Sequence, residues 1–333
     1  MSEFSYTRPE TLVEAVNVLG RAGSVPLGGG TDLLVTIDEG LVAPSLVVDV
    51  RDLPGARDVA LGADGSLRIG SGVRIAELAS NATIRAQFPS LANAAASVGT
   101  PALRNMGTLG GNLAQRVRCW YLRRGVKCFK AGGTACAAVE GEHQYHGIIA
   151  GGTCHAVHPS DPAVALLALD AQVEIARGSQ AAVARRAGDT SNTLTRTISI
   201  DALFAGASSS PASETTLERG ELITAVTIPA VSSGGVQHWE KLMQRGAWDF
   251  ALVSCAAIRR ADGTVRMALG GVGASPWRVP LSVEEDVASG GLDEESLEAL
   301  AERAMYDAEP LPGTAYKVTL ARTLLRRAMR ALT

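Results

Sequence analysis

The sequence predicts an α+β fold, and three observations support this class. Apolar residues recur at helical spacing near both ends of the chain, whereas residues 221–228 follow the alternating pattern of a strand. Hydrophobic residues make up 46% of the 333 residues and charged residues 20%, the balance of a globular protein long enough for two or three domains. Aromatic residues make up 4%, against 36 glycines, so we expect an aliphatic core and many tight turns.

The first segments are predicted as a helix and then strands. Thr11 can cap a helix, and residues 24–27 form a short strand. Residues 46–50 are apolar enough for a buried strand, and residues 57–72 have the pattern of a hairpin. The short helices that follow carry these apolar residues: Ile75, Leu78, Ala79, Leu91, Ala94, Ala95 and Val98.

The C-terminal part is predicted as a smaller α+β domain that begins near residue 230. Residues 205–216, rich in Ser, Ala and Pro, are predicted as a surface loop ahead of the strand at residues 221–228. Strands come first in the C-terminal domain and two helices last. The final helix has these apolar residues on one face: Ala321, Leu324, Leu325, Ala328, Met329 and Leu332.

Two glycine-rich segments have the composition of ligand-binding loops. Residues 28–30 are consecutive glycines, which allow positive φ and close approach of a ligand, and successive N–H groups in such a turn bind anions. Thr31 and Asp32 stand where a helix would start, with exposed amides suited to phosphate. The second segment, residues 100–113, offers Gly107, Thr108, Gly110, Gly111 and Asn112.

Neither loop is a Rossmann fingerprint, because that motif needs a buried strand before the loop and an acidic residue about twenty positions later, and this combined context is missing. A P-loop is also absent from the sequence, so a nucleoside triphosphatase is not expected.

Four of the five cysteines fall within residues 119–154, at Cys119, Cys128, Cys136 and Cys154. Four thiolates are the ligand set of a [4Fe-4S] cluster, and soft sulfur ligands also suit zinc. Two disulfides or buried thiols are the alternative, although disulfides belong to oxidising compartments. Cys255 lies in an apolar strand-like segment and is predicted to be a core residue.

The charges near these cysteines suit an anionic group. Residues 101–139, here called the basic window, contain seven cations and no acidic residue. Positive charge stabilises a bound anion such as an iron-sulfur cluster or a pyrophosphate. The alternatives are a solvated basic face or a docking surface for an acidic partner. The histidines His143, His146, His155 and His158 keep a Cys/His zinc site open, although no short Cys-x2-Cys knuckle is present. The cations are Arg104, Arg116, Arg118, Arg123, Arg124, Lys127 and Lys130.

Net charge and hydropathy exclude two classes of partner. A net charge of -3 and a pI near 6.0 argue against a nucleic-acid-binding surface. The sequence has no apolar run long enough to span a membrane and no export signal at its start, so we expect no membrane insertion and a cytoplasmic location.

Residues 26–34, 69–78, 103–113 and 157–166 together resemble the FAD-binding medium subunit of the molybdenum hydroxylases, the family of xanthine dehydrogenase and carbon monoxide dehydrogenase. The resemblance covers nearly the whole chain. The cysteine window is similar to the [4Fe-4S] loop of the bacterial aldehyde oxidoreductase medium subunit. It is also comparable to the cluster loop of the 4-hydroxybenzoyl-CoA reductase medium subunit, but its surrounding residues fit the aldehyde branch better.

The resemblance implies a fold and its domains. Residues 1–55 and 56–225 would be the two lobes of an FAD-binding domain of the molybdopterin dehydrogenase type, with a cluster loop at about residues 115–156. Residues 230–333 would form the smaller CO dehydrogenase flavoprotein C-terminal domain.

The resemblance also implies the site residues. The first loop would hold the FAD pyrophosphate, the second would line the other side of the cofactor, and Ser160 with Asp161 would bond its ribityl or phosphate region. The four cysteines would ligate the [4Fe-4S] cluster, and no catalytic residue is expected in this chain. The cofactor-binding residues are Leu27, Gly28, Gly29, Gly30, Thr31, Asp32, Leu33, Gly107, Thr108, Gly110, Gly111, Asn112, Ser160 and Asp161.

The implied function is electron transfer in a heterotrimer that oxidises aldehydes to carboxylic acids. Partners would be a large molybdenum-cofactor subunit and a small subunit with two [2Fe-2S] clusters, and this chain would pass electrons on to an external acceptor. Such a complex can also be periplasmic, if exported folded with a signal-bearing partner. The alternatives are a medium subunit of a 4-hydroxybenzoyl-CoA reductase-like or other xanthine dehydrogenase-family enzyme, a stand-alone FAD oxidase, and a Cys/His zinc scaffold.

Overall fold

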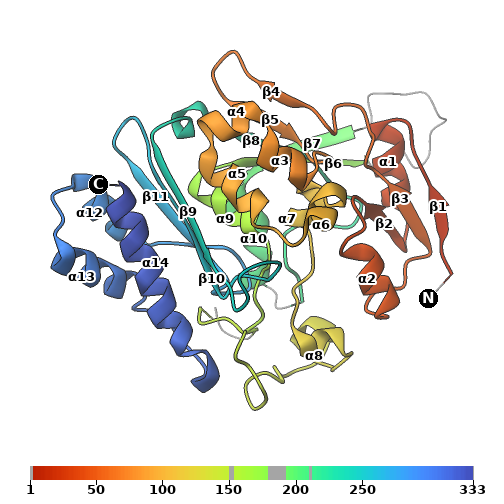
Figure 1. Cartoon of the computed structure of the whole chain (residues 1–333). Helices are drawn as coiled ribbons and strands as arrows, with labels where there is room; N and C mark the ends of the chain where they lie inside the picture. Colours follow the sequence, from red (N-terminus) through yellow and green to blue (C-terminus); the bar gives the residue numbers. More distant parts are fainter. Residues whose placement is uncertain (1–2, 150–153, 179–192, 210–211, 333) are drawn as a thin grey trace.

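The computed structural model describes residues 3–149, 154–178, 193–209 and 212–332, and its strands form three sheets. Figure 1 shows the N-terminal elements and the C-terminal helices on opposite sides of the central part of the chain. Helices pack with all three sheets, so the predicted α+β class is confirmed. Among the described residues, no helix is both long and apolar enough to cross a membrane.

The first sheet is parallel, with strand order β1-β3-β2. Its strands are β1 (Ser5–Thr7), β2 (Ser24–Leu27) and β3 (Leu46–Asp49). Between them lie α1 (Leu12–Leu19) and α2 (Leu33–Asp38). Thr11 caps α1 as predicted, because its hydroxyl accepts a hydrogen bond from the Glu14 N–H at 3.2 Å.

The second sheet is antiparallel, with strand order β4-β5-β8-β6-β7. Its strands are β4 (Val59–Leu61), β5 (Leu67–Gly70), β6 (Gln172–Gly178), β7 (Thr193–Ser199) and β8 (Leu222–Ile228). The hairpin predicted at residues 57–72 is the β4-β5 pair. The surface loop predicted at residues 205–216 is only partly a loop. Gly206–Ser209 form a short helix, α11, which follows α10 (Ile200–Phe204) along the chain.

Helices that follow the first hairpin build the main core against this sheet. They are α3 (Ile75–Ser80), α4 (Ala82–Gln87), α5 (Pro89–Ala96), α6 (Pro101–Met106), α7 (Leu109–Leu113) and, further on, α9 (Asp161–Ala168). All eight residues of α9 are buried, and α9 packs against α5 on one side and β10 and β11 on another. The segment between α7 and α9 contains the four clustered cysteines and two short helices, α8 (Trp120–Arg123) and η1 (Phe129–Ala131).

The third sheet is antiparallel, with order β12-β11-β10-β9, and carries the C-terminal helices. Its strands are β9 (Val236–Leu242), β10 (Val253–Arg259), β11 (Val265–Gly270) and β12 (Trp277–Arg278), preceded by η4 (Ala230–Ser232). The helical elements are α12 (Leu281–Ser289), α13 (Glu294–Ala304), η5 (Pro312–Thr314) and α14 (Tyr316–Leu332). The predicted apolar face of α14 is buried against this sheet, and Cys255 is a core residue as predicted.

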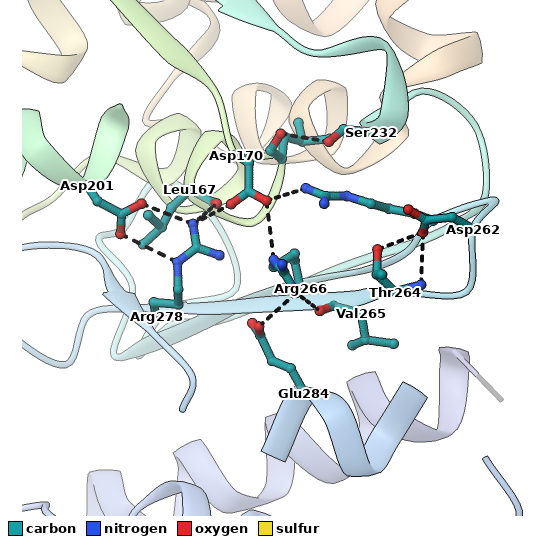
Figure 2. Close-up of polar contacts among 12 residues, drawn as sticks. Leu167, Asp170, Asp201, Ser232, Asp262, Thr264, Val265, Arg266, Arg278 and Glu284 are labelled. Carbon is teal, nitrogen blue, oxygen red and sulfur yellow. Dashed lines mark hydrogen bonds and ion pairs between the residues drawn. The ribbon is translucent and has the colours of Figure 1, made fainter. Parts of the chain in front are cut away.

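One carboxylate, that of Asp170, joins the third sheet to the end of α9 (Figure 2). It binds three guanidinium groups: Arg278 at 2.6 Å, Arg266 at 3.2 Å and Arg260. Burial alone would raise the pKa of Asp170, but the arginines hold that pKa below its usual value. The Asp170 carboxylate therefore links the sheet of the C-terminal domain to the helix at the centre of the main core.

We expect Asp170→Asn to lower the free energy of unfolding by about 2 kcal/mol, because hydrogen bonds to charged groups contribute about 1.5–3 kcal/mol each. Asn tolerates the left-handed φ of 52° at this position, so the change tests the charge rather than the backbone. Denaturant unfolding is the measurement. Glu218→Gln, which removes an exposed ion pair with Arg177, is the control and should change stability little. Equal losses in both variants would contradict the special role of Asp170.

Candidate functional site

The two glycine loops pack against each other backbone to backbone. The first loop follows β2, and a Cβ at Gly29 would overlap the carbonyl of Met106 at the end of α6. A Cβ at Gly28 would lie 2.6 Å from the Thr108 hydroxyl oxygen. Gly30 has a φ of +74°, in the left-handed region that favours glycine. Close contact with the second loop thus requires glycine at Gly28 and Gly29 of the first loop.

The second loop is held by side-chain caps. The Thr108 hydroxyl accepts a hydrogen bond from the Gly111 N–H at 3.3 Å, at the start of α7. Asn112 in α7 accepts a hydrogen bond from the Ser160 hydroxyl at 2.5 Å. Ser160 in turn caps α9, because its hydroxyl oxygen accepts from the Ala163 N–H at 3.1 Å. The Ser160 hydroxyl is therefore part of the support for the second loop.

A cavity of about 440 Å³ lies between the two loops. Two predicted residues do not line it: Leu27, which remains in β2, and Ser160, which lines a neighbouring cavity of about 590 Å³. Both cavities have Arg118, Asp161 and Phe250 in their walls. The predicted residues that line the first cavity are Gly28, Gly29, Gly30, Thr31, Asp32, Leu33, Gly107, Thr108, Gly110, Gly111, Asn112 and Asp161.

The C-terminal domain also contributes to this cavity, which the sequence reasoning did not foresee. Lys241 of β9 donates to the Asp161 carboxylate at 2.7 Å, and both side chains are almost fully buried. Burial raises the pKa of Asp161. Trp248, with a φ of 62°, and Phe250 line the cavity from the β9-β10 turn. Their one sequence signal was that they fall in residues 230–333, which the resemblance assigned to the C-terminal domain without naming any site residue there.

Asp32 has a role that its position in the first loop did not predict. Its carboxylate accepts from the Arg116 N–H at 2.7 Å and from the Arg123 guanidinium at 3.0 Å, and it also pairs with Arg118. Arg118 lies over the Phe250 ring, 5.6 Å from its centroid. The carboxylate of Asp32 therefore anchors the cysteine segment to the first glycine loop.

Several cations of the basic window are paired, so the window is not simply a solvated positive face. Arg116 and the buried Lys130 both lie near the Glu214 carboxylate, at 3.1 Å and 3.5 Å. Arg123 also pairs with Glu39 at 2.8 Å. These acidic partners come from outside residues 101–139, which is why the sequence alone did not show the pairing.

The four clustered cysteines line one small cavity, together with the buried Lys130. Cys119, Cys128, Cys136 and Cys154 are all free thiols, so the disulfide alternative is not observed. Burial raises the pKa of the Cys119 and Cys154 thiols. The structure thus brings together thiols that lie on separate turns of the segment.

These thiols do not form a finished metal site. In the part of the chain that the structure describes, no three His, Cys, Asp or Glu side chains are placed to hold a metal ion. A single zinc ion, with Zn–S of about 2.3 Å, needs ligand sulfurs about 3.8 Å apart, whereas the sulfurs of a [4Fe-4S] cluster bind different irons and lie further apart. The cavity holds about 10 Å³, so a cluster would have to push its walls outward. The donor set fits a cluster, but the cluster prediction is not confirmed.

One of the four histidines near these cysteines, His146, contacts a thiol. His146 Nε2 lies 3.3 Å from Cys119 Sγ, and burial lowers the pKa of His146 to about 4. His143 instead binds the Ala138 carbonyl at 2.8 Å and the Gly313 N–H at 3.0 Å. His158 is buried against Phe204, with ring centroids 4.7 Å apart.

Comparison with known proteins identifies two family matches along the chain. Residues 2–231 match the FAD binding domain in molybdopterin dehydrogenase. Residues 239–332 match the CO dehydrogenase flavoprotein C-terminal domain.

The chain is also similar to curated proteins over nearly its full length. It is 34% identical to the aldehyde oxidoreductase FAD-binding subunit PaoB of Escherichia coli (strain K12), over 98% of this chain and 96% of that protein. It is 26% identical to the carbon monoxide dehydrogenase medium chain of Hydrogenophaga pseudoflava, over 98% of this chain and 96% of that one.

Solved structures share the fold. Carbon monoxide dehydrogenase from Hydrogenophaga pseudoflava, in a form lacking the Mo-pyranopterin moiety, matches with a TM-score of 0.72 at 23% identity, over 99% of this chain and 97% of that chain. Quinoline 2-oxidoreductase from Pseudomonas putida 86 matches with a TM-score of 0.71 at 23% identity, over 99% of each chain.

We expect Gly111→Val to lose most bound FAD while the chain stays folded. A Cβ at Gly111 would meet only the Thr108 hydroxyl, at 3.1 Å, so the added methyl groups occupy the cavity rather than the core. Flavin absorbance per chain, with thermal unfolding alongside, measures both effects. Gly20→Val is the control, because its Cβ makes ordinary contacts at 3.5 Å and 3.6 Å away from the cavity. Full flavin occupancy in Gly111→Val would show that FAD does not bind in this cavity.

Proposed function

Because this chain belongs to the FAD-binding medium subunits of the molybdenum hydroxylase family, we propose that it is the electron-transfer subunit of a heterotrimeric aldehyde-oxidising enzyme. In that reaction an aldehyde and water give a carboxylic acid, two protons and two electrons, and the carbon chemistry takes place in a partner subunit. Bound FAD supplies the electron exchange between an iron-sulfur subunit and an external acceptor.

The cavity between the touching glycine loops is the observation that carries the FAD assignment. Gly28 to Leu33 would hold the pyrophosphate, because a glycine backbone lets phosphate oxygens reach the N–H groups. Thr108, Gly110 and Gly111 would line the opposite side. Asp161 reaches the same cavity, and Ser160 would act by holding Asn112 in place.

The cluster is proposed for the four-thiol cavity. The cavity unites cysteines that are far apart in the segment, and the buried Lys130 lines it with them, its ammonium 3.5 Å from the Glu214 carboxylate. Both features favour an anionic cluster with four thiolate ligands. The two proposed cofactor sites share an anchor, because Asp32 of the first loop binds the arginines that precede and follow Cys119.

The aldehyde substrate and the partners rest on the relatives. Identity to the aldehyde oxidoreductase subunit is 34%, against 26% for an Escherichia coli O157:H7 xanthine dehydrogenase subunit. Several relatives are named medium chains or subunits, which supports one larger and one smaller partner. We propose that the large partner carries the molybdenum cofactor and the small partner two [2Fe-2S] clusters. We place the complex in the cytoplasm, with folded export alongside a signal-bearing partner as the alternative.

Replacing any one of Cys119, Cys128, Cys136 and Cys154 by Ser should remove most iron from the chain, because a cluster loses a ligand. Iron and acid-labile sulfide, measured per chain, report the loss. Cys255→Ala is the control, since Cys255 is buried in β10 and does not line the four-thiol cavity. Iron that survives all four Ser variants would disprove the ligand set.

Co-expression with the two partners should yield a complex that contains molybdenum and oxidises aldehydes. The isolated chain should not oxidise them, because its proposed role is to move electrons only. Aldehyde-dependent dye reduction, with metal analysis, distinguishes the two cases. Turnover of an aldehyde or a sugar by the isolated chain would favour a stand-alone oxidase instead.

A further inference from the structure

The cavity of about 590 Å³ beside the proposed FAD site has no role in the function proposed above. Its volume falls within the range of about 300–1,000 Å³ that is typical of small-molecule sites. The cysteine segment contributes Trp120 and Tyr145 to its walls, and the turn between β9 and β10 contributes Phe250. The Tyr145 hydroxyl donates to the Gln244 side-chain oxygen at 2.6 Å and so joins the segment to the turn.

This cavity has a buried inner end and an outer end that is open to solvent. Ser254 of β10 is fully buried and Val164 of α9 is 2% exposed, and both line it. Phe250 and Tyr145 also line it and are 51% and 42% exposed. A small molecule can therefore enter past the two exposed rings and reach Ser254.

The hydroxyl of Ser254 is a buried polar group that lacks a partner. It makes no hydrogen bond with any residue that the structure describes. Ser254 pairs with Gly270 of β11, and a Cβ at Gly270 would lie 2.5 Å from the Ser254 hydroxyl oxygen, so glycine leaves room for this hydroxyl. Buried polar groups are nearly always hydrogen-bonded. A ligand oxygen that accepts from Ser254 would satisfy the hydroxyl.

The charged groups in the walls are already paired, so the cavity suits a neutral ligand. Burial lowers the pKa of His146 to about 4 and that of His158 to about 3, so both rings in the walls are neutral near pH 7. The ion pairs are Asp161 with Lys241, Arg245 with Asp249 and Arg118 with Asp32.

We propose that this cavity binds the ring of a quinone, the external acceptor of the electrons that FAD carries. A quinone is neutral and flat, its ring packs against aromatic side chains, and its carbonyl oxygen accepts from the Ser254 hydroxyl. The two larger cavities share Arg118, Asp161 and Phe250, so the ring lies next to the flavin site. The quinone takes two electrons and two protons, which reduced FAD supplies, and leaves as a hydroquinone. The acceptor role rests on the electron-transfer function proposed above.

Equilibrium dialysis of duroquinone against the assembled, FAD-loaded complex tests the site. All free ring positions of duroquinone are methylated, which prevents addition of a thiol such as Cys119 in the same cavity. We expect one duroquinone per copy of this chain, with FAD retained. Ser254→Ala should raise the dissociation constant about tenfold, because it removes a buried hydrogen-bond donor. The variant should stay folded, because the lost hydroxyl has no partner in the described part of the chain.

Two controls separate the hydrogen bond from general effects. Ser24→Ala should leave the affinity unchanged, because the Ser24 hydroxyl also lacks a partner among the described residues but lines neither larger cavity. Durene, the hydrocarbon without the two oxygens of duroquinone, should bind wild type and Ser254→Ala equally. Ser254→Ala should also slow reoxidation of reduced FAD about tenfold at low duroquinone, and the difference should vanish at saturation.

Equal duroquinone affinity in wild type and Ser254→Ala would overturn the site. Displacement of FAD by duroquinone would also overturn it, because the cavity would then belong to the flavin. Ser254-dependent binding without reoxidation of FAD would overturn the acceptor role. A wild-type complex without flavin would contradict the function proposed above, whereas Ser254-dependent binding to that complex would still support the quinone site. Decylubiquinone distinguishes two sources that both support the site: tighter binding than duroquinone indicates a membrane quinone, and equal binding a water-soluble one.

Discussion

The close approach of the two glycine loops is the constraint on which the rest of the site depends. Gly29 lies so near the Met106 carbonyl that no larger residue fits without moving one of the loops. This contact sets the opening of the cavity between the loops and places Asp32 where its carboxylate reaches Arg116 and Arg123. The cysteine segment is thus tied to the first glycine loop through the Asp32 carboxylate. A change in loop packing would therefore act on both proposed cofactor sites.

Polar contacts made by the C-terminal domain complete the arrangement. Lys241 pairs with Asp161 at the cavity wall, and Lys317 binds carbonyls beside the four-thiol cavity. Asp170 links the same domain to α9 through three arginines. A polar or charged group is costly to bury unless it is paired or hydrogen-bonded, so these contacts favour one relative placement of the sheets. The C-terminal domain therefore helps to position both proposed sites, although neither glycine loop belongs to it.

Local features were predictable from the sequence, whereas long-range pairing was not. The Thr11 cap, the hairpin, the buried face of α14 and the burial of Cys255 follow from residue type and spacing alone. The glycine loops were also recognisable, because only glycine allows such backbone approach. The partners of Asp32 lie more than eighty residues away, and Lys241 meets Asp161 across eighty residues. No periodicity encodes such contacts. Leu27 and Ser160, which the resemblance assigned to the cofactor, do not line the cavity.

Two cofactor positions are proposed: FAD in the cavity between the glycine loops, and a [4Fe-4S] cluster bound by the four clustered thiols. A crystal of the purified complex, with anomalous diffraction collected at the iron absorption edge, tests both positions in one measurement. We predict flavin density between the two loops and an iron peak enclosed by the sulfurs of Cys119, Cys128, Cys136 and Cys154. Flavin bound elsewhere on the chain would contradict the first position, and four free thiols with no iron between them would contradict the second.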